Sequence, residues 1–178
     1  MPNKCNDQHG FSLIELLIVV LVIGIIAAIA IPNLLSSRRA ANEASAISAM
    51  RLYHGAQSTY AASVGGGQFA GDPSSAVNLQ AFTQLAAAGL IDNALALGTK
   101  SGYIFAGAKI DPNGINPASF CGRAVPVVGS GVFSTGPRNI AITTEGVIYA
   151  GLADVGTHAD CSIVSGGFTV TGASPLAP

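Results

Sequence analysis

The sequence predicts an α+β fold in which one long N-terminal helix packs on an antiparallel β-sheet. An apolar run begins at Phe11, and helical spacing of apolar residues continues beyond it to about Ser63. After Gly102, short runs rich in β-branched and aromatic residues alternate with turn residues, which is typical of antiparallel strands. Such a sheet needs an apolar cover on one face, and the second half of the helix offers it.

The composition indicates a membrane-attached chain with a modest domain behind the attachment. Of the 178 residues, 49% are apolar and only 10% are charged, so length alone predicts about one domain beside a membrane segment. The mean hydropathy is +0.51, and much of the excess lies in the first 35 residues. The formal net charge of −1 gives no basic surplus, so we expect no nucleic-acid partner.

The first element is a candidate membrane helix over Phe11–Ile31. As a helix it spans about 30 Å, the thickness of a bilayer's hydrocarbon core. Its orientation stays open on charge alone, because Lys4 precedes it while Arg38 and Arg39 follow it. Taken alone, the positive-inside rule leans against an outward C-terminal domain.

Glu15 is the one ionisable side chain of this run. A carboxylate in the apolar interior of a bilayer costs about 2.5–3.5 kcal/mol, so Glu15 either reaches water at the interface or has a function. If the chain were cut between Gly10 and Phe11, the new α-amino group would lie at a helix N-terminus, where a cation is disfavoured. Glu15, four residues on and on the same face, would then satisfy that charge.

Pro32 either ends this helix or kinks it, because proline removes a donor and clashes with the preceding turn. The following residues favour continuation, and we expect one helix from about Ser12 to Ser63, kinked near Pro32. Its apolar stripe is predicted at Ala40, Ala41, Ala44, Ile47, Met50 or Arg51, Leu52, Ala56 and Tyr60. The residues predicted off the stripe are Arg38, Arg39, Glu43 and Ser45.

A Gly- and Ser-rich break over Ser63–Ser75 ends the helix. A short helix is expected over Leu79–Ala88, with Leu79, Phe82 and Leu85 or Ala86 inward and Gly89 as its C-cap. The predicted strands are Tyr103–Ile110, Ser119–Val128, Asn139–Thr144, Val147–Gly151 and Gly167–Thr171. Glu145-Gly146 is predicted as a hairpin turn, and Pro126 as an edge or bulge position.

The sequence shows no catalytic or metal-binding cluster, so no enzyme activity and no cofactor are expected. His54 and Ser58 are an i, i+4 pair, but no acid or elbow motif accompanies them. The spacing of Asp154, His158, Asp160 and Cys161 matches no zinc pattern. Cys121 and Cys161, an even number beyond the first helix, are compatible either with a disulfide in an oxidising compartment or with two unrelated thiols.

The stretch "GFSLIELLIVVLVIGIIAAIAIPNLL" closely resembles the N-terminal signature of type IV pilins and of the pseudopilins of type II secretion. The strands "GTKSGYIFAG" and "RNIAITTEGVIYA" also resemble the sheet of type IVa major pilins. The resemblance implies that a prepilin peptidase cuts after Gly10 and methylates the amine of Phe11. It further implies that Glu15 pairs with that amine on an adjacent subunit and that the helix unwinds between Gly24 and Pro32 in filaments.

The resemblance also implies a C-terminal disulfide, for which Cys121 and Cys161 are the candidates, and a periplasmic C-terminal domain. The expected organisation is a leader over 1–10, an assembly helix over 11–35, an amphipathic half over 36–63, a connecting loop over 64–101 and a sheet with tail over 102–178. We expect a precursor in the inner membrane that polymerises with itself into an extracellular pilus, helped by the peptidase and the pilus assembly machinery. A pseudopilin of a type II secretion system is the alternative, and a signal-anchored periplasmic enzyme or binding protein is a remoter one.

Overall fold

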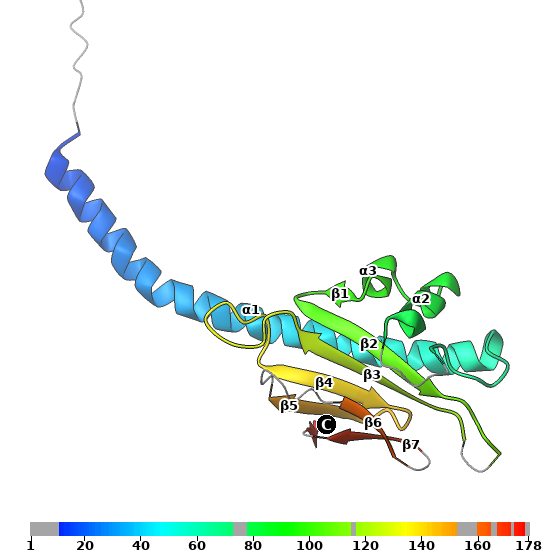
Figure 1. Cartoon of the computed structure of the whole chain (residues 1–178). Helices are drawn as coiled ribbons and strands as arrows, with labels where there is room; N and C mark the ends of the chain where they lie inside the picture. Colours follow the sequence, from blue (N-terminus) through cyan, green and yellow to red (C-terminus); the bar gives the residue numbers. More distant parts are fainter. Residues whose placement is uncertain are drawn as a thin grey trace, which may run out of the picture. The chain divides into compact units, whose positions relative to one another are not determined.

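The computed structural model describes residues 11–72, 78–114, 117–152, 160–164, 167–171 and 173–176, with only the backbone described from 152 to 171. The chain forms two compact units, Met1–Ser37 and Arg38–Pro178. Helix α1 (Leu13–Ser63) begins in the first unit and ends in the second (Figure 1). Pro32 lies inside α1, so the helix does not end there, and the kink predicted at this residue stays a prediction.

An antiparallel sheet follows α1, which confirms the predicted α+β class. Its six strands lie in the order β1-β2-β3-β4-β5-β8. They are β1 (Thr99–Lys100), β2 (Tyr103–Ile110), β3 (Ser119–Pro126), β4 (Arg138–Thr143), β5 (Ile148–Leu152) and β8 (Ser174–Pro175). The hairpin turn after β4 forms as expected: the Gly146 amide donates to the Thr143 carbonyl, and Gly146 has a φ of 76°.

The second half of α1 packs on one face of this sheet through a set of residues that differs from the predicted stripe. The buried residues are Glu43, Ala46, Ala49, Met50, Tyr53, Ala56 and Gln57. Met50 and Ala56 were predicted correctly, and Ile47 and Tyr60 are partly buried against the core. Of the alternatives Met50 and Arg51, Met50 is the buried one. The prediction was wrong for Ala40, Ala41, Ala44 and Leu52, which are exposed. It was also wrong for Glu43, which is buried because it has a cationic partner on β4.

The core between α1 and the sheet is built around Tyr53. Its ring stacks on Phe82 at a centroid distance of 4.5 Å and meets the edge of Phe120 at 5.8 Å. Gly107 on β2 and Gly122 on β3 are directly paired in register, and both lie against Tyr53. A Cβ at Gly122 would lie 2.7 Å from Tyr53 Cε1, so this glycine pair makes the space that the tyrosine fills.

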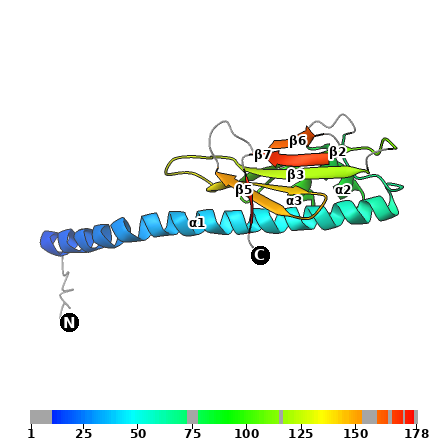
Figure 2. The ribbon, with the colours of Figure 1, turned by 90° about the horizontal axis from the view of Figure 1, so that it is seen from below.

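The other face of the sheet carries a two-stranded hairpin of β6 (Asp160–Val164) and β7 (Gly167–Thr171). This hairpin contacts β3 and β4, and Figure 2 shows it on the side of the sheet opposite to α1. Gly167–Thr171 was predicted as a strand and is confirmed, whereas β6 was missed. The unit from Arg38 on therefore has three layers: helix, sheet and hairpin.

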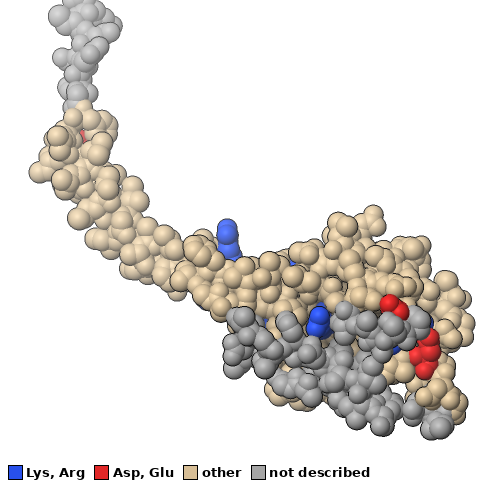
Figure 3. Space-filling model, viewed as in Figure 1, with Lys and Arg blue, Asp and Glu red and all other residues tan. Residues whose placement is uncertain are grey.

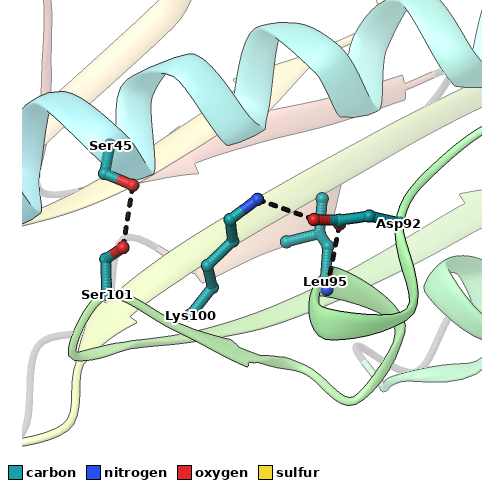
Figure 4. Close-up of polar contacts among 5 residues, drawn as sticks. All are labelled: Ser45, Asp92, Leu95, Lys100 and Ser101. Atoms are coloured by element: carbon teal, nitrogen blue, oxygen red, sulfur yellow. Dashed lines mark hydrogen bonds and ion pairs between the residues drawn. The ribbon is translucent and has the colours of Figure 1, made fainter.

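The segment between α1 and the sheet holds two short helices, α2 (Gln80–Ala87) and α3 (Asn93–Ala96). The helix predicted over Leu79–Ala88 is α2, and it ends in a Schellman arrangement in which Gly89 has a φ of 71°. Helix α3 is capped by Asp92, which accepts from the Leu95 amide at 3.1 Å and pairs with Lys100 at 2.9 Å (Figure 4). That hydrogen bond from Lys100 lowers the pKa of Asp92.

Two polar contacts fix this segment to α1. Ser45 donates to Ser101 at 2.9 Å, next to the turn between β1 and β2 (Figure 4). Gln57, fully buried, donates to the Ala70 carbonyl at 2.9 Å and accepts from the Ala70 amide at 2.8 Å. Because both ends of the amide are satisfied, burying this polar side chain is not penalised.

Candidate functional site

The candidate site is the apolar segment at the start of α1. Phe11 and Ser12 precede the helix, and the Leu16 amide donates to the Ser12 carbonyl at 3.2 Å, so the first helical turn begins at Leu13. Glu15 lies in this first turn. An acidic side chain there is favoured by the helix macrodipole, which explains why the helix tolerates a charge at this end.

No other part of the described chain covers this apolar segment. Its most apolar 18-residue window has a mean hydropathy of 3.2 and no buried residue, and α1 is long and apolar enough to cross a membrane. Its large side chains are exposed throughout, for example Leu13 at 84% and Ile29 at 67%. Figure 3 shows the same stretch almost without charged side chains. A contiguous apolar surface of this size requires a cover of lipid or protein.

Glu15 is exposed on this bare helix. Among the residues that the structure describes, no group of the same chain donates a hydrogen bond or forms an ion pair with its carboxylate. The carboxylate is therefore available to a cation from outside the described part of the chain. Phe11 is 80% exposed, while Gly10 lies outside the described residues, so cleavage between the two stays a prediction.

Gly24 and Pro32 both lie within continuous helix. A Cβ added at Gly24 would meet no heavy atom within 4 Å, so no packing contact within the chain requires glycine there. Glycine costs about 1 kcal/mol relative to alanine in a helix, and Pro32 removes one amide donor from the same stretch. Both residues thus lower the stability of the helix locally, and the unwinding expected between them stays a prediction.

The apolar segment was compared with known proteins. Residues 5–31 match the model of the prokaryotic N-terminal methylation motif. Over 38 residues the chain is 55% identical to the type IV wide pilus major component PilA4 of Thermus thermophilus. The N-terminal part of the chain is therefore similar to that of a type IV pilin. The resemblance predicted for this segment is thereby confirmed.

The match to the pilin covers 21% of this chain and 29% of the relative. The matched likeness covers only a small part of either chain, so the fold described above rests on the structure. No solved structure matches the chain. The structure nevertheless has the long helix and the antiparallel sheet that the sequence predicted.

The two predicted disulfide partners lie on strands that touch each other. Cys121 is fully buried in β3 and is disulfide-bonded, and Cys161 belongs to β6, which contacts β3. The side chain of Cys161 lies outside the described part of the chain, so the pairing of Cys121 with Cys161 stays a prediction.

The residues considered for other chemistry do not assemble into a site. Ser58 donates to the backbone carbonyl of His54 at 3.2 Å, and His54 Nε2 lies 3.1 Å from the Thr144 carbonyl, so the two side chains do not form a nucleophile–base pair. In the described part of the chain no three His, Cys, Asp or Glu side chains gather as a metal site. The side chains of Asp154, His158 and Asp160 lie outside it.

A polar cluster that sequence reasoning missed joins α1 to β4. Arg138 Nε donates to Glu43 Oε1 at 2.7 Å, and the Tyr103 hydroxyl donates to the Arg138 carbonyl at 3.1 Å. Burial, with the nearby Glu43 carboxylate, raises the pKa of Tyr103 to about 12, so its hydroxyl keeps the proton that it donates. The signal was present: Glu43, Ala46, Met50, Tyr53 and Gln57 repeat at alternating intervals of three and four.

Proposed function

We propose that this chain is a structural subunit of a type IV pilus and not an enzyme. It is made as a precursor in the inner membrane with its C-terminal domain in the periplasm. A prepilin peptidase cuts it between Gly10 and Phe11 and methylates the new amine, and copies then polymerise through α1 into an extracellular fibre. The observation that carries the proposal is an uncovered apolar helix with a carboxylate in its first turn that has no partner among the described residues, in a segment that matches the methylation motif.

The energetics favour transfer of the helix from lipid to a helical bundle. Lipid tails are as apolar as the side chains of the segment, so moving it between the two environments has little hydrophobic cost. The apolar surface of the segment is therefore not exposed to water during this transfer. Specificity must then come from packing and from polar pairs, which count for more where water is absent.

Glu15 supplies such a pair. In lipid its carboxylate costs about 2.5–3.5 kcal/mol, and in a bundle that cost is relieved by the cationic amine of Phe11 on a neighbouring copy. The amine is equally unfavourable alone, because it lies at the positive end of the helix macrodipole. Assembly thus pairs two charges that are each unfavourable alone, so the charge pair favours polymerisation over simple anchoring.

Substitution of Glu15 tests this proposal. Glu15→Gln keeps the shape and removes the charge, and Glu15→Val removes both; each is expected to insert and to be cleaved, but to lower the yield of sheared surface fibres at least tenfold. Val19→Leu, one turn further along the same helix, is the matched control and is expected to assemble normally.

Yield is measured by electron microscopy and immunoblotting of the sheared fraction, with the membrane-bound amount as reference. Normal fibre yield from both Glu15 variants would overturn the role of the charge. A chain that is processed yet never appears in surface fibres would overturn the pilus assignment itself.

A further inference from the structure

The loop between β3 and β4, residues 127–137, presents an apolar surface that nothing in the described part of the chain covers. Its four large side chains, Val127, Val128, Val132 and Phe133, form what we call the loop patch; Phe133 is 82% exposed and Val132 is 65% exposed. The loop has no ionisable side chain, so bringing it against another apolar surface requires no desolvation of a charge.

This loop is held in place by the helix. Arg39 donates from Nε to the Ser134 carbonyl at 3.2 Å, and from one terminal nitrogen to the Gly131 and Val132 carbonyls at 3.0 and 2.6 Å. Asn42 donates to the Thr135 carbonyl at 2.8 Å. Figure 1 shows the loop lying along α1. An exposed phenylalanine on a pinned backbone loses little further entropy on binding, which favours recognition.

A second exposed surface lies on α1, opposite to the side that packs on the sheet. We call it the outer face of α1; it is made of Ala40, Ala41, Ala44, Ser48, Leu52 and Gly55. Arg51 is its one charged residue over this length. The outer face of a solvent-exposed helix ordinarily carries many charged side chains, and its lack of them here indicates a surface that becomes covered. Small side chains also let an aromatic ring approach the helix closely.

We propose that the loop patch of one subunit packs on the outer face of α1 of a second copy, with Phe133 as the central contact. The two surfaces are different parts of one chain, so their contact is heterologous, which is the kind of contact that an open helical fibre requires. Polymerisation through the apolar segment brings copies side by side. The inference therefore rests on the proposed function and names a second contact within the same polymer.

Charged substitutions test the loop patch in the full-length chain. Phe133→Asp is expected to reduce the sheared fibre yield at least tenfold, because a buried aromatic contact at the centre of an interface carries much of its affinity. Leu97→Asp is the matched control: Leu97 is 78% exposed, lies outside both surfaces and is expected to leave the yield within twofold. Membrane-bound amount and thermal unfolding report whether either variant misfolds. Equal yields from the two variants would overturn the proposal.

Cysteine cross-linking locates the contact while Phe133 stays in place. Val132→Cys is combined in turn with Ala44→Cys, Ser48→Cys and Leu52→Cys, and intact fibres are oxidised before denaturing electrophoresis. We expect a ladder of covalent multimers from at least one pair and none when Leu97→Cys replaces Val132→Cys. Fibres that give no ladder with any pair would overturn this contact and leave the pilus assignment standing. Absence of fibres from the unsubstituted chain would overturn both.

Discussion

Glu43 brings a carboxylate to the boundary between α1 and β4, where its side chain keeps only 9% exposure. Its partner Arg138 is 40% exposed, so solvent reaches the cation but scarcely the anion. The two ends of this ion pair are therefore not equivalent. Removal of Arg138 leaves a buried charge without its cation, whereas removal of Glu43 leaves an arginine that water can solvate.

Arg138→Met is accordingly expected to destabilise the chain by about 2–3 kcal/mol, because it keeps an unbranched stem but leaves Glu43 without its cation. Lys100→Met is the control: it breaks the exposed pair with Asp92 and is expected to cost less than about 1 kcal/mol. Thermal unfolding of the detergent-solubilised chain, followed by circular dichroism, measures both. Equal losses for the two variants would show that Glu43 is solvated rather than buried.

At this scale the sequence predicts only part of the buried face of α1. Apolar residues such as Ala44 and Leu52 were placed inside but are exposed, because apolar side chains also occur on the exposed side of a helix. Met50 and Ala56 were placed correctly. Glu43 and Gln57 were not, since their burial depends on partners that come from β4 and from the loop at Ala70, far along the chain. Only the alternating spacing of three and four carried that information.

The sheet accommodates α1 through the glycine pair of β2 and β3. Gly107 and Gly122 stand opposite each other, and a Cβ at Gly122 would lie 2.7 Å from both Met50 Cε and Tyr53 Cε1. Tyr53 is fully buried, and burial raises the pKa of its hydroxyl, so the group stays neutral and donates to the Cys121 carbonyl at 3.4 Å. The glycine pair of the sheet thus fits the shape of Tyr53 on the helix.

Gly122→Ala is expected to destabilise the chain by about 1–3 kcal/mol, because overpacking forces Tyr53 and Met50 from their positions. Gly55→Ala is the matched control with the opposite sign. Gly55 is an exposed residue of α1 whose Cβ would meet nothing within 4 Å, so alanine there is expected to stabilise by up to about 1 kcal/mol. Thermal unfolding of both variants checks the pair, and an unchanged melting temperature for Gly122→Ala would contradict the close fit.

Element boundaries were predictable where periodicity was long enough. The strand over Tyr103–Ile110 was predicted with both ends correct, and β3 begins at Ser119 as expected and ends at Pro126. Strand β4 pairs with β3 only over Cys121–Ala124, so Pro126 lies where no donor toward β4 is needed. The two-residue strands β1 and β8 and the four-residue helix α3 were missed, because such short elements carry no period of their own.

For the molecule as a whole, the segment that carries the proposed function was the most predictable part. Its length, its apolar run and its lone Glu15 are all local features of the sequence, and the structure places them on an uncovered helix. The loop patch and the outer face of α1 were not predictable in this way. Both depend on which side of α1 packs on the sheet and on how Arg39 holds a loop from more than ninety residues away.

The most direct test of the whole account is the intact mass and N-terminal peptide of the subunit recovered from sheared surface fibres. We expect a chain that begins at Phe11 and carries one methyl group on its α-amine, with residues 1–10 absent. A subunit that retains the leader, begins elsewhere, or is missing from the fibres would contradict the account.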